Sequence, residues 1–228
     1  MGSLAFRRTG SLAKAMVILL AVIAAFEVID IPAKFALRRK AHRFVTGSIT
    51  EDAFRDALRR QGTIAGLQGA AVIAVIVLTM VWMYRLALNH RVLGRPDSTW
   101  APGWAIGGWF VPPFAIYAVP WLMLTELWRG SDPANTPNDP AWKRRSSTPL
   151  LVVWWILYGF VPILGLVAFT TIGFGNVPVN NVEDYARRLD DYFALQFALS
   201  LVSVASAAIF AKIVHDLSLR QGRLTGER

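Results

Sequence analysis

The 228-residue sequence contains no cysteine, only three histidines and few charged residues, which make up 17% of the chain. The lack of cysteine excludes disulfides, thiolate metal sites, cysteine nucleophiles and covalent haem attachment. The histidines, His42, His90 and His215, lie far apart in sequence and are too few for most imidazole metal sites. A soluble domain carries about 25% charged residues, so this sparse charge argues against an ordinary soluble surface.

The chain is rich in long hydrophobic blocks, and hydrophobic residues make up 54% of the total. An α-helix needs about 20 mostly apolar residues to cross ~30 Å of hydrocarbon. Four blocks meet this requirement and predict four firm transmembrane helices, at about 15–33, 64–86, 150–171 and 192–211. The expected fold is therefore an all-α integral membrane protein, with a single helical membrane domain at 1–217 and a polar tail at 218–228.

A fifth apolar stretch, at about 101–127, is rich in tryptophan and proline. Pro112, Pro113 and Pro120 each remove a backbone donor, and the carbonyl groups freed in hydrocarbon need partners in neighbouring helices or water. The length of the stretch suits a kinked fifth span. The six tryptophans between positions 100 and 142 favour instead a re-entrant hairpin that stays close to the headgroups.

The loop at 38–62 is predicted to carry a short surface helix of its own. Thr50 is a suitable N-cap for it. Two acidic residues follow in the first turn and two arginines lie in the last turn, an order that matches the helix dipole at both ends: Glu51, Asp52, Arg59 and Arg60.

The net charge of +9 would suggest a nucleic-acid partner in a soluble protein. In a membrane protein it indicates basic loops near anionic headgroups. With five spans, the two sides of the membrane carry 16 and 8 Lys and Arg residues, and the positive-inside rule places the N-terminus outside. With a re-entrant hairpin the counts are 14 and 10, and both termini lie inside. Orientation and the form of the fifth element are therefore coupled.

Several motif blocks follow one another in the region 82–133. In order they are Trp82-Met-Tyr-Arg85, Asn89, Leu93-Gly94, Trp100-Ala-Pro-Gly-Trp104, Gly108-Trp-Phe-Val-Pro112, Pro120 and Glu126-Leu-Trp-Arg-Gly-Ser131-Asp-Pro133. This order resembles the actinobacterial membrane family known as domain of unknown function 4328. The resemblance implies a multi-pass membrane protein of actinobacterial origin, and it implies no activity.

Glu27 and Asp30 are the most unusual residues, because both are acidic and lie within a predicted span. Their i, i+3 spacing puts them on one face of a helix. An ionisable residue inside a membrane is by default a functional candidate, so this face could bind a cation or relay protons. In the alternative interpretation the two carboxylates anchor the helix near the headgroups or pair with Lys34 or Arg38.

Arg85 and Glu126 each end an apolar element just inside an interface. In the hairpin form they lie at the same face and could pair. In the five-span form they lie on opposite sides, and each would simply extend its charge towards water. Asn89, next to His90 and Arg91, is either a contact for lipid phosphate or a partner, or part of a solvated helix end.

The broken element at 103–128 is a further candidate, through Trp104, Pro112, Pro120 and Trp128. Transporters use the ends of broken helices at membrane depth to hold ions or anionic substrates. The alternative is a purely architectural role. Glycines at i, i+4 permit close helix approach, as at Gly103 and Gly107 and at Gly62 and Gly66.

No P-loop, nucleophile elbow, zinc-protease or dinucleotide motif occurs, so no enzyme activity, cofactor or metal is expected. The function expected first is a non-catalytic structural or accessory subunit of the plasma membrane. The alternative is a small ion or solute transporter or channel that uses the broken helix and the Glu27/Asp30 face. The expected partners are anionic lipid headgroups and another membrane protein or a second copy of the chain, without nucleic acid.

Overall fold

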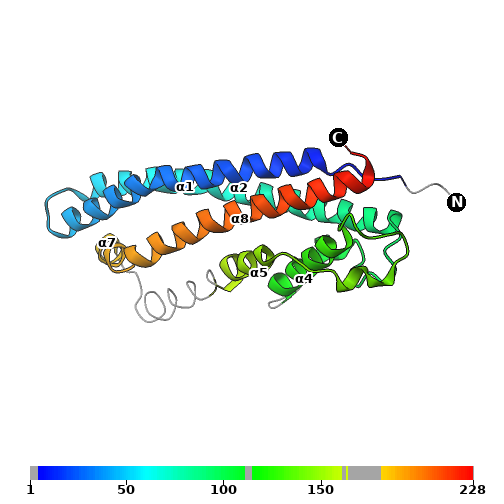
Figure 1. The fold of residues 1–228 in the computed structure, drawn as a ribbon. Helices are drawn as coiled ribbons and strands as arrows, with labels where there is room; N and C mark the ends of the chain where they lie inside the picture. Colours follow the sequence, from blue (N-terminus) through cyan, green and yellow to red (C-terminus); the bar gives the residue numbers. More distant parts are fainter. Residues whose placement is uncertain (1–4, 111–114, 161–162, 164–180, 228) are drawn as a thin grey trace. The chain divides into compact units, whose positions relative to one another are not determined.

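The computed structural model describes residues 5–110, 115–160, 163 and 181–227, and every regular element within them is a helix (Figure 1). Three helices are long and apolar enough to cross a membrane: α1 (Gly10–Val45), α2 (Glu51–Val92) and α8 (Phe193–Thr225). Three of the four predicted spans lie in these helices. The all-helical, membrane-compatible class is thereby confirmed for the described residues.

The span expected at 150–171 is described only in part. Helix α5 (Pro149–Trp155) begins after Thr148, whose hydroxyl accepts the Leu150 N–H, and it continues into the π-helical turn η2 (Ile156–Phe160). The apolar helix described here, Pro149–Gly159, is too short to cross a bilayer by itself. Because most of 161–171 lies outside the described residues, a fourth span stays a prediction.

The stretch at 101–127 differs from a single kinked helix. Helix α3 (Trp104–Gly107) is one turn long and gives way to a turn that reaches Phe110. Helix α4 (Ala115–Gly130) then contains Pro120. Pro112, one of the predicted site residues, lies outside the described residues.

The separate surface helix expected at 51–60 is wrong, because α2 runs without interruption from Glu51 to Val92. Its predicted start is correct: the Thr50 carbonyl accepts the Phe54 N–H, and Glu51 and Asp52 occupy the first turn. The predicted end failed because the stretch 61–92 contains glycines and no proline, and an isolated glycine weakens a helix by about 1 kcal/mol without breaking it.

The chain forms two compact units. Unit 1 comprises residues 1–21, 73–156 and 208–228, and unit 2 comprises residues 22–72 and 157–207. Each of the three long helices contributes one section to each unit. Unit 1 also contains α3, α4, α5 and the short 3-10 helix η1 (Pro140–Arg144), and unit 2 contains α7 (Val182–Asp191).

Each unit has its own core. In unit 2, Phe54 of α2 is fully buried against Ala186 of α7 and stacks on Phe44 of α1 with ring centroids 5.2 Å apart. In unit 1, Trp154 of α5 stacks on Phe210 of α8 at 4.7 Å. These contacts join segments that are remote in sequence.

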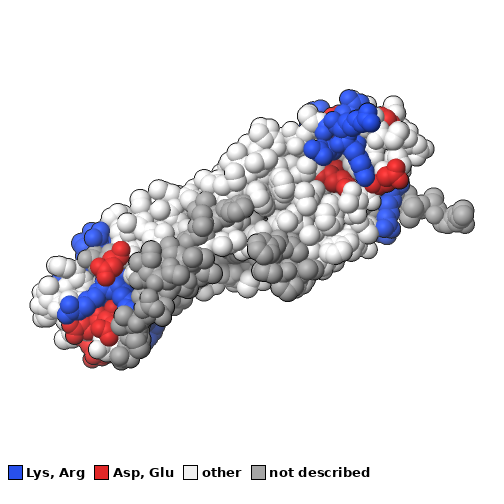
Figure 2. Space-filling model, turned by 90° about the horizontal axis from the view of Figure 1, so that it is seen from below, with Lys and Arg blue, Asp and Glu red and all other residues white. Residues whose placement is uncertain are grey.

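Large apolar side chains also point outward. Ile29 of α1 is 73% exposed, and Leu67 and Ile73 of α2 are 63% and 64% exposed. In Figure 2, the charged side chains gather in two places, and the other described surface on that face is uncharged. A soluble monomer rarely exposes so many large apolar groups, so these surfaces suit lipid.

Candidate functional site

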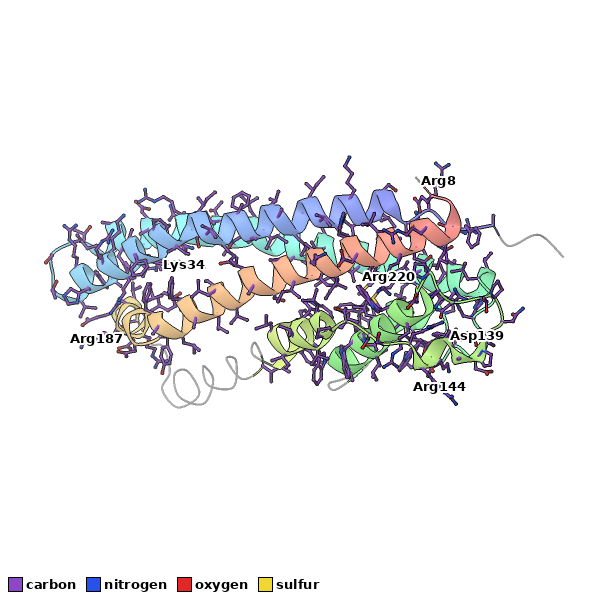
Figure 3. The ribbon with its side chains drawn as sticks, in the orientation of Figure 1. Arg8, Lys34, Asp139, Arg144, Arg187 and Arg220 are labelled. Carbon is purple, nitrogen blue, oxygen red and sulfur yellow. The ribbon has the colours of Figure 1, made fainter. Side chains whose placement is uncertain are left out.

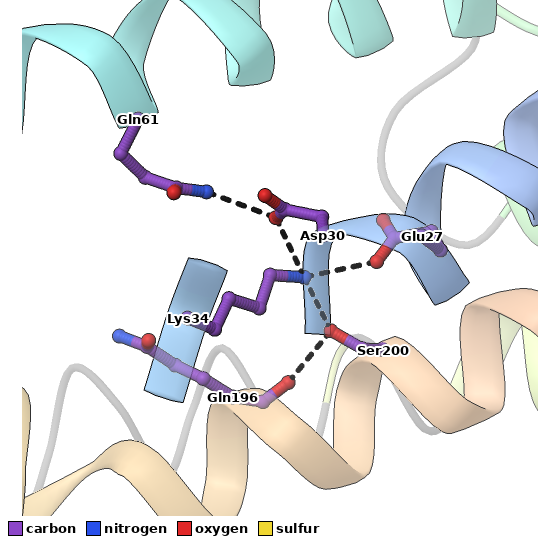
Figure 4. A network of polar contacts seen from close by, with 6 residues as sticks. All are labelled: Glu27, Asp30, Lys34, Gln61, Gln196 and Ser200. Carbon is purple, nitrogen blue, oxygen red and sulfur yellow. Dashed lines mark hydrogen bonds and ion pairs between the residues drawn. The ribbon is translucent and has the colours of Figure 1, made fainter. Parts of the chain in front are cut away.

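In unit 2, the two acidic residues of α1 share one lysine (Figure 4). The Lys34 ammonium lies 2.9 Å from Glu27 Oε2 and 3.5 Å from Asp30 Oδ2. It also donates a hydrogen bond to the Ser200 hydroxyl of α8 at 2.7 Å. Positions 27, 30 and 34 fall on one face of the helix, so the expected pairing with Lys34 is present. We call Glu27, Asp30, Lys34, Gln61 and Ser200 the carboxylate cluster.

Asp30 is the most deeply placed member of the carboxylate cluster, with 3% of its surface exposed. Its Oδ2 accepts a hydrogen bond from Gln61 Nε2 of α2 at 2.9 Å. Its Oδ1 is buried and has no hydrogen-bond donor among the described residues. The cluster therefore ties α1 to α2 and α8, and it contains two carboxylates for one ammonium. Such a group can bind a proton or a small cation.

In unit 1, Asn89 of α2 brackets the backbone of the N-terminal segment. Its Oδ1 accepts the Arg7 N–H at 2.7 Å, and its Nδ2 donates to the Arg7 carbonyl at 2.9 Å. Asn89 is only 1% exposed, and its Nδ2 also lies 3.4 Å from Gln221 Oε1 of α8. The solvated helix end considered for this residue is wrong, because its amide joins three segments in the protein interior.

A second buried set continues this network. Gln221 Nε2 donates to the Ser131 hydroxyl at 2.8 Å, and Ser131 donates to the Leu127 carbonyl at 2.7 Å. His90 Nε2 lies 3.3 Å from the same hydroxyl, and because the Ser131 proton is already used, His90 acts as the donor. We call Asn89, His90, Ser131 and Gln221 the polar junction.

The ring of His90 is neutral in this setting. It is 2% exposed and lies beyond the apolar section of α2 at 64–86. Burial, reinforced by the charge of Arg95, lowers the pKa of His90 from 6.5 to about 3. Gly130 leaves room for the ring, since a Cβ there would lie 2.3 Å from His90 Cε1. The fit requires glycine at this position.

Arg95 extends the buried set beyond the end of α2. Gly94 adopts a left-handed conformation with φ +61°, and the Arg95 N–H bonds the His90 carbonyl at 3.1 Å, which closes the helix with a Schellman turn. The guanidinium donates to the carbonyls of Gly130 at 2.8 Å and Thr136 at 2.9 Å. Burial lowers the pKa of Arg95, and nearby Asp139 and Asp132 oppose that shift.

Arg85 and Glu126 do not pair with each other. Arg85 donates to the Arg8 carbonyl at 2.8 Å (Figure 3 labels Arg8). Glu126 Oε1 accepts the N–H groups of Thr99 at 2.9 Å and Trp100 at 3.4 Å. The end of α4 therefore lies against the start of the stretch that leads into α3, and the carboxylate of Glu126 joins the two ends of this element.

Trp128 and Trp104 occupy contrasting positions. Trp128 is 5% exposed, and the guanidinium of Arg220 from α8 lies 4.3 Å above its ring (Figure 3 labels Arg220). This cation–π contact joins α4 to α8. Trp104 is 42% exposed and touches Trp100 edge to face at 5.8 Å. Only Trp128 belongs to the core.

Pro120 interrupts the hydrogen bonds of α4, as its sequence position predicts. One turn earlier, the Tyr117 carbonyl accepts the indole N–H of Trp155 at 3.0 Å. A neighbouring helix thus supplies a donor to this part of α4. The close approach of α3 and α4 depends on Gly108, where a Cβ would lie 2.5 Å from Val119 Cγ1. A Cβ added at Gly103 or Gly107 would meet nothing within 4 Å among the described residues, so these glycines do not provide the expected close approach.

Sequence reasoning missed Gln221, Ser131 and Arg95. The first two are ordinary polar residues, and only their burial (0% exposed for both) marks them. The signal for Arg95 was available, because Leu93-Gly94 is a typical helix stop that fixes the direction of the next residue. Within the described residues there is no group of three or more His, Asp or Glu placed to hold a metal ion.

Comparison with curated proteins and with solved structures returned no match. The family model described as "Domain of unknown function (DUF4328)" matches residues 46–218. The match includes α2, the interrupted element of α3 and α4, and most of α8, together with His90, Ser131 and Glu126. The chain therefore belongs to this domain family of unknown function, DUF4328.

Proposed function

We propose that the protein is a non-catalytic, multi-pass subunit of the actinobacterial plasma membrane, with a structural or accessory role. The observation that carries this proposal is what three polar side chains bind. Asn89 binds the Arg7 backbone, Glu126 binds the Thr99 backbone, and Lys34 joins α1 to α8. Each of these polar groups binds another segment of the same chain and so stabilises the fold, as expected for a protein with a structural role.

The proposed topology has four spans and a re-entrant hairpin at 98–130. The contact of Glu126 with Thr99 supports this form, because it joins the entry and the exit of the hairpin. Three further contacts gather one end of unit 1: Arg7 with Asn89, Thr9 with Glu227, and Ser131 with Gln221. In this topology both termini share the side that carries 14 of the 24 Lys and Arg residues, which is the cytoplasmic side by the positive-inside rule.

Cysteine labelling in the naturally cysteine-free chain tests the topology. Single variants Ser98→Cys, Ala134→Cys, Ser48→Cys and Tyr185→Cys place a thiol at exposed positions. In intact cells with an impermeant maleimide, Ser98→Cys and Ala134→Cys should both stay unlabelled, because both thiols lie on the cytoplasmic side. Ser48→Cys and Tyr185→Cys should both be labelled, because their thiols lie outside. Opposite labelling of Ser98→Cys and Ala134→Cys would establish the five-span form and overturn the hairpin.

The proposed partners are anionic lipid headgroups and a second membrane protein or another copy of the chain, and no nucleic acid. The open surroundings of Gly62 and Gly66 support a helix partner from outside the chain. A Cβ at either position would meet nothing within 4 Å among the described residues, so neither glycine packs closely against another described segment of the chain. Chemical crosslinking in native membranes, with a crosslinked copy or partner lost in Gly66→Leu, tests this part of the proposal.

The second candidate function is transport of a cation or proton through the carboxylate cluster. It is favoured by the excess carboxylate and by the buried, unsatisfied Oδ1 of Asp30. Ion flux into proteoliposomes should then vanish in Asp30→Asn and persist in Glu126→Gln. Cysteines at 27, 30, 112 and 120 should also react with aqueous reagents if water reaches a pathway, whereas a purely structural subunit should leave them unlabelled.

A further inference from the structure

A groove of about 680 Å³ opens in unit 1 between the first turns of α1 and the last turns of α8. Its α1 wall consists of residues spaced 3 and 4 apart: Gly10, Ala13, Lys14, Val17 and Ile18. Its α8 wall follows the same spacing through His215, Ser218, Leu219, Gly222 and Arg223, and Gly226 and Glu227, which follow the helix, close one end. Each wall is therefore a single helix face.

Small residues create this groove. Five of the twelve lining residues are glycine, alanine or serine, so the two helices lie side by side with little side-chain volume between them. The end of the chain also holds α1 in place, since Glu227 accepts the N–H groups of Thr9 at 2.9 Å and Gly10 at 3.1 Å. This carboxylate satisfies donors at the helix N-terminus, and it forms an ion pair with neither Lys14 nor Arg223.

The chemistry of the lining divides along its length. Val17, Ile18 and Leu219 supply an apolar wall, and the first two belong to the predicted span at 15–33. Lys14 directly precedes that span, and Arg223 lies beyond the apolar block at 192–211. The groove thus combines an apolar section at the edge of the hydrocarbon with two permanent cations at headgroup level.

We infer that this groove binds one anionic phospholipid, with its phosphate between Lys14 and Arg223 and an acyl chain along Val17, Ile18 and Leu219. Charge complementarity selects an anionic head, and the apolar wall selects a lipid over a free anion. The cytoplasmic leaflet supplies anionic lipids, so the inference rests on the proposed membrane location and orientation. It adds a specific lipid-binding site to the proposed structural or accessory role.

The test is direct binding of short-chain lipids to the full chain purified in neutral detergent, measured by native mass spectrometry. Dihexanoyl phosphatidylglycerol should bind with one-to-one stoichiometry and about 10- to 30-fold more tightly than dihexanoyl phosphatidylcholine, given two basic contacts. The variant Lys14→Gln/Arg223→Gln should lose this preference, whereas Lys14→Arg/Arg223→Lys should keep it. Equal binding of the two lipids by the wild-type chain would overturn the inference.

The matched control is Arg91→Gln/Arg144→Gln, which removes two exposed arginines of unit 1 that do not line the groove. It should bind phosphatidylglycerol like the wild type, and an equal loss in this control would show general charge attraction and no built site. Ile18→Trp fills the apolar section and should weaken lipid binding while both cations remain.

Competition with inorganic phosphate distinguishes a site for a phospholipid from a site for a free phosphate ion. If it displaces phosphatidylglycerol at equal concentration, the groove is an anion site and the lipid inference is wrong. Carbonate extraction of cell membranes tests membrane integration separately. A chain that stays in the membrane but shows no lipid preference would reject this groove alone and leave the proposed function standing.

Discussion

The two units solve the same problem of buried polarity in different ways. Unit 2 groups formal charges, with a half-buried Glu27 and a buried Asp30 around one half-buried lysine, and leaves Asp30 Oδ1 unsatisfied. Unit 1 buries mostly neutral groups, and the amide of Asn89, the hydroxyl of Ser131 and the amide of Gln221 all hydrogen bond within the chain. A satisfied network fixes one arrangement, whereas an unbalanced charged one can respond to a proton or an ion. The polar residues of unit 1 therefore hold its segments in one arrangement, whereas the carboxylate cluster of unit 2 is the group most able to gain or lose a proton or an ion.

The largest expected effect comes from removing the shared cation of unit 2. Lys34→Met leaves two carboxylates without their ammonium and should cost about 3–5 kcal/mol of stability, as loss of one partner of a buried ion pair does. Thermal unfolding in detergent measures the loss. The triple variant Glu27→Gln/Asp30→Asn/Lys34→Met should recover most of it, because no uncompensated charge remains. A triple variant as unstable as the single one would show that packing of the lysine matters, and not charge balance.

The next effect concerns the steric fit in unit 1. Gly130→Ala places a methyl group 2.3 Å from His90 Cε1, so the ring or the end of α4 must move at a cost of about 1–3 kcal/mol. The matched control is Gly66→Ala, where the added methyl meets nothing within 4 Å and the helix gains about 0.5–1 kcal/mol. Opposite shifts in the melting temperature of the two variants are expected. Similar shifts would contradict the close contact at Gly130.

Acidification should destabilise unit 1 through His90. Its pKa is 6.5 in the unfolded chain and about 3 in the folded protein, so the unfolded chain binds more protons between these values and stability falls as pH falls through 6.5. Between pH 7 and pH 5 the contribution of this residue is a loss of about 2 kcal/mol. Unfolding measured at both pH values should show this loss. His90→Gln should remove that part of the pH dependence, and a pH profile unchanged by the substitution would show that the ring is not buried neutral.

The smallest effect is expected for the two residues considered as an ion pair. Arg85→Glu removes an exposed hydrogen bond to the Arg8 carbonyl and should cost below about 1 kcal/mol. Glu126→Arg removes the acceptor for Thr99 and Trp100. Because the two side chains have different partners, the charge-swapped double variant should show additive losses within about 0.5 kcal/mol. Rescue in the double variant would show that they pair after all.

Local patterns predicted much of the fold. The cap at Thr50, the three long apolar helices and the pairing of Glu27 and Asp30 with Lys34 depend on residues within about two turns of one another. The false helix end after Arg60 has a local cause as well, because a charge pattern that suits a terminus is not a stop without proline or a left-handed residue.

The polar junction could not be predicted in this way. Ser131 and Gln221 are 90 positions apart, and Arg7 and Asn89 are 82 apart. Neither pair has a distinctive spacing, and both residues in each pair belong to types that usually face water. The contacts exist because helices from distant parts of the chain meet, which no window of sequence describes. The same holds for Gly130, whose need for glycine is set by the ring of His90.

The bond between Glu227 and Gly10 has a consequence for biogenesis. The two residues are 217 positions apart, and at about 5–20 residues per second a ribosome needs roughly 10–40 s to travel between them. The start of α1 therefore waits for its carboxylate until the chain between the two residues has been synthesised. During that time the insertion machinery or the lipid must keep the helix in place, and the groove beside it forms only when the last helix arrives. The contact is thus expected to form only after residue 227 has been synthesised, in a step that a pulse-chase protease assay can time.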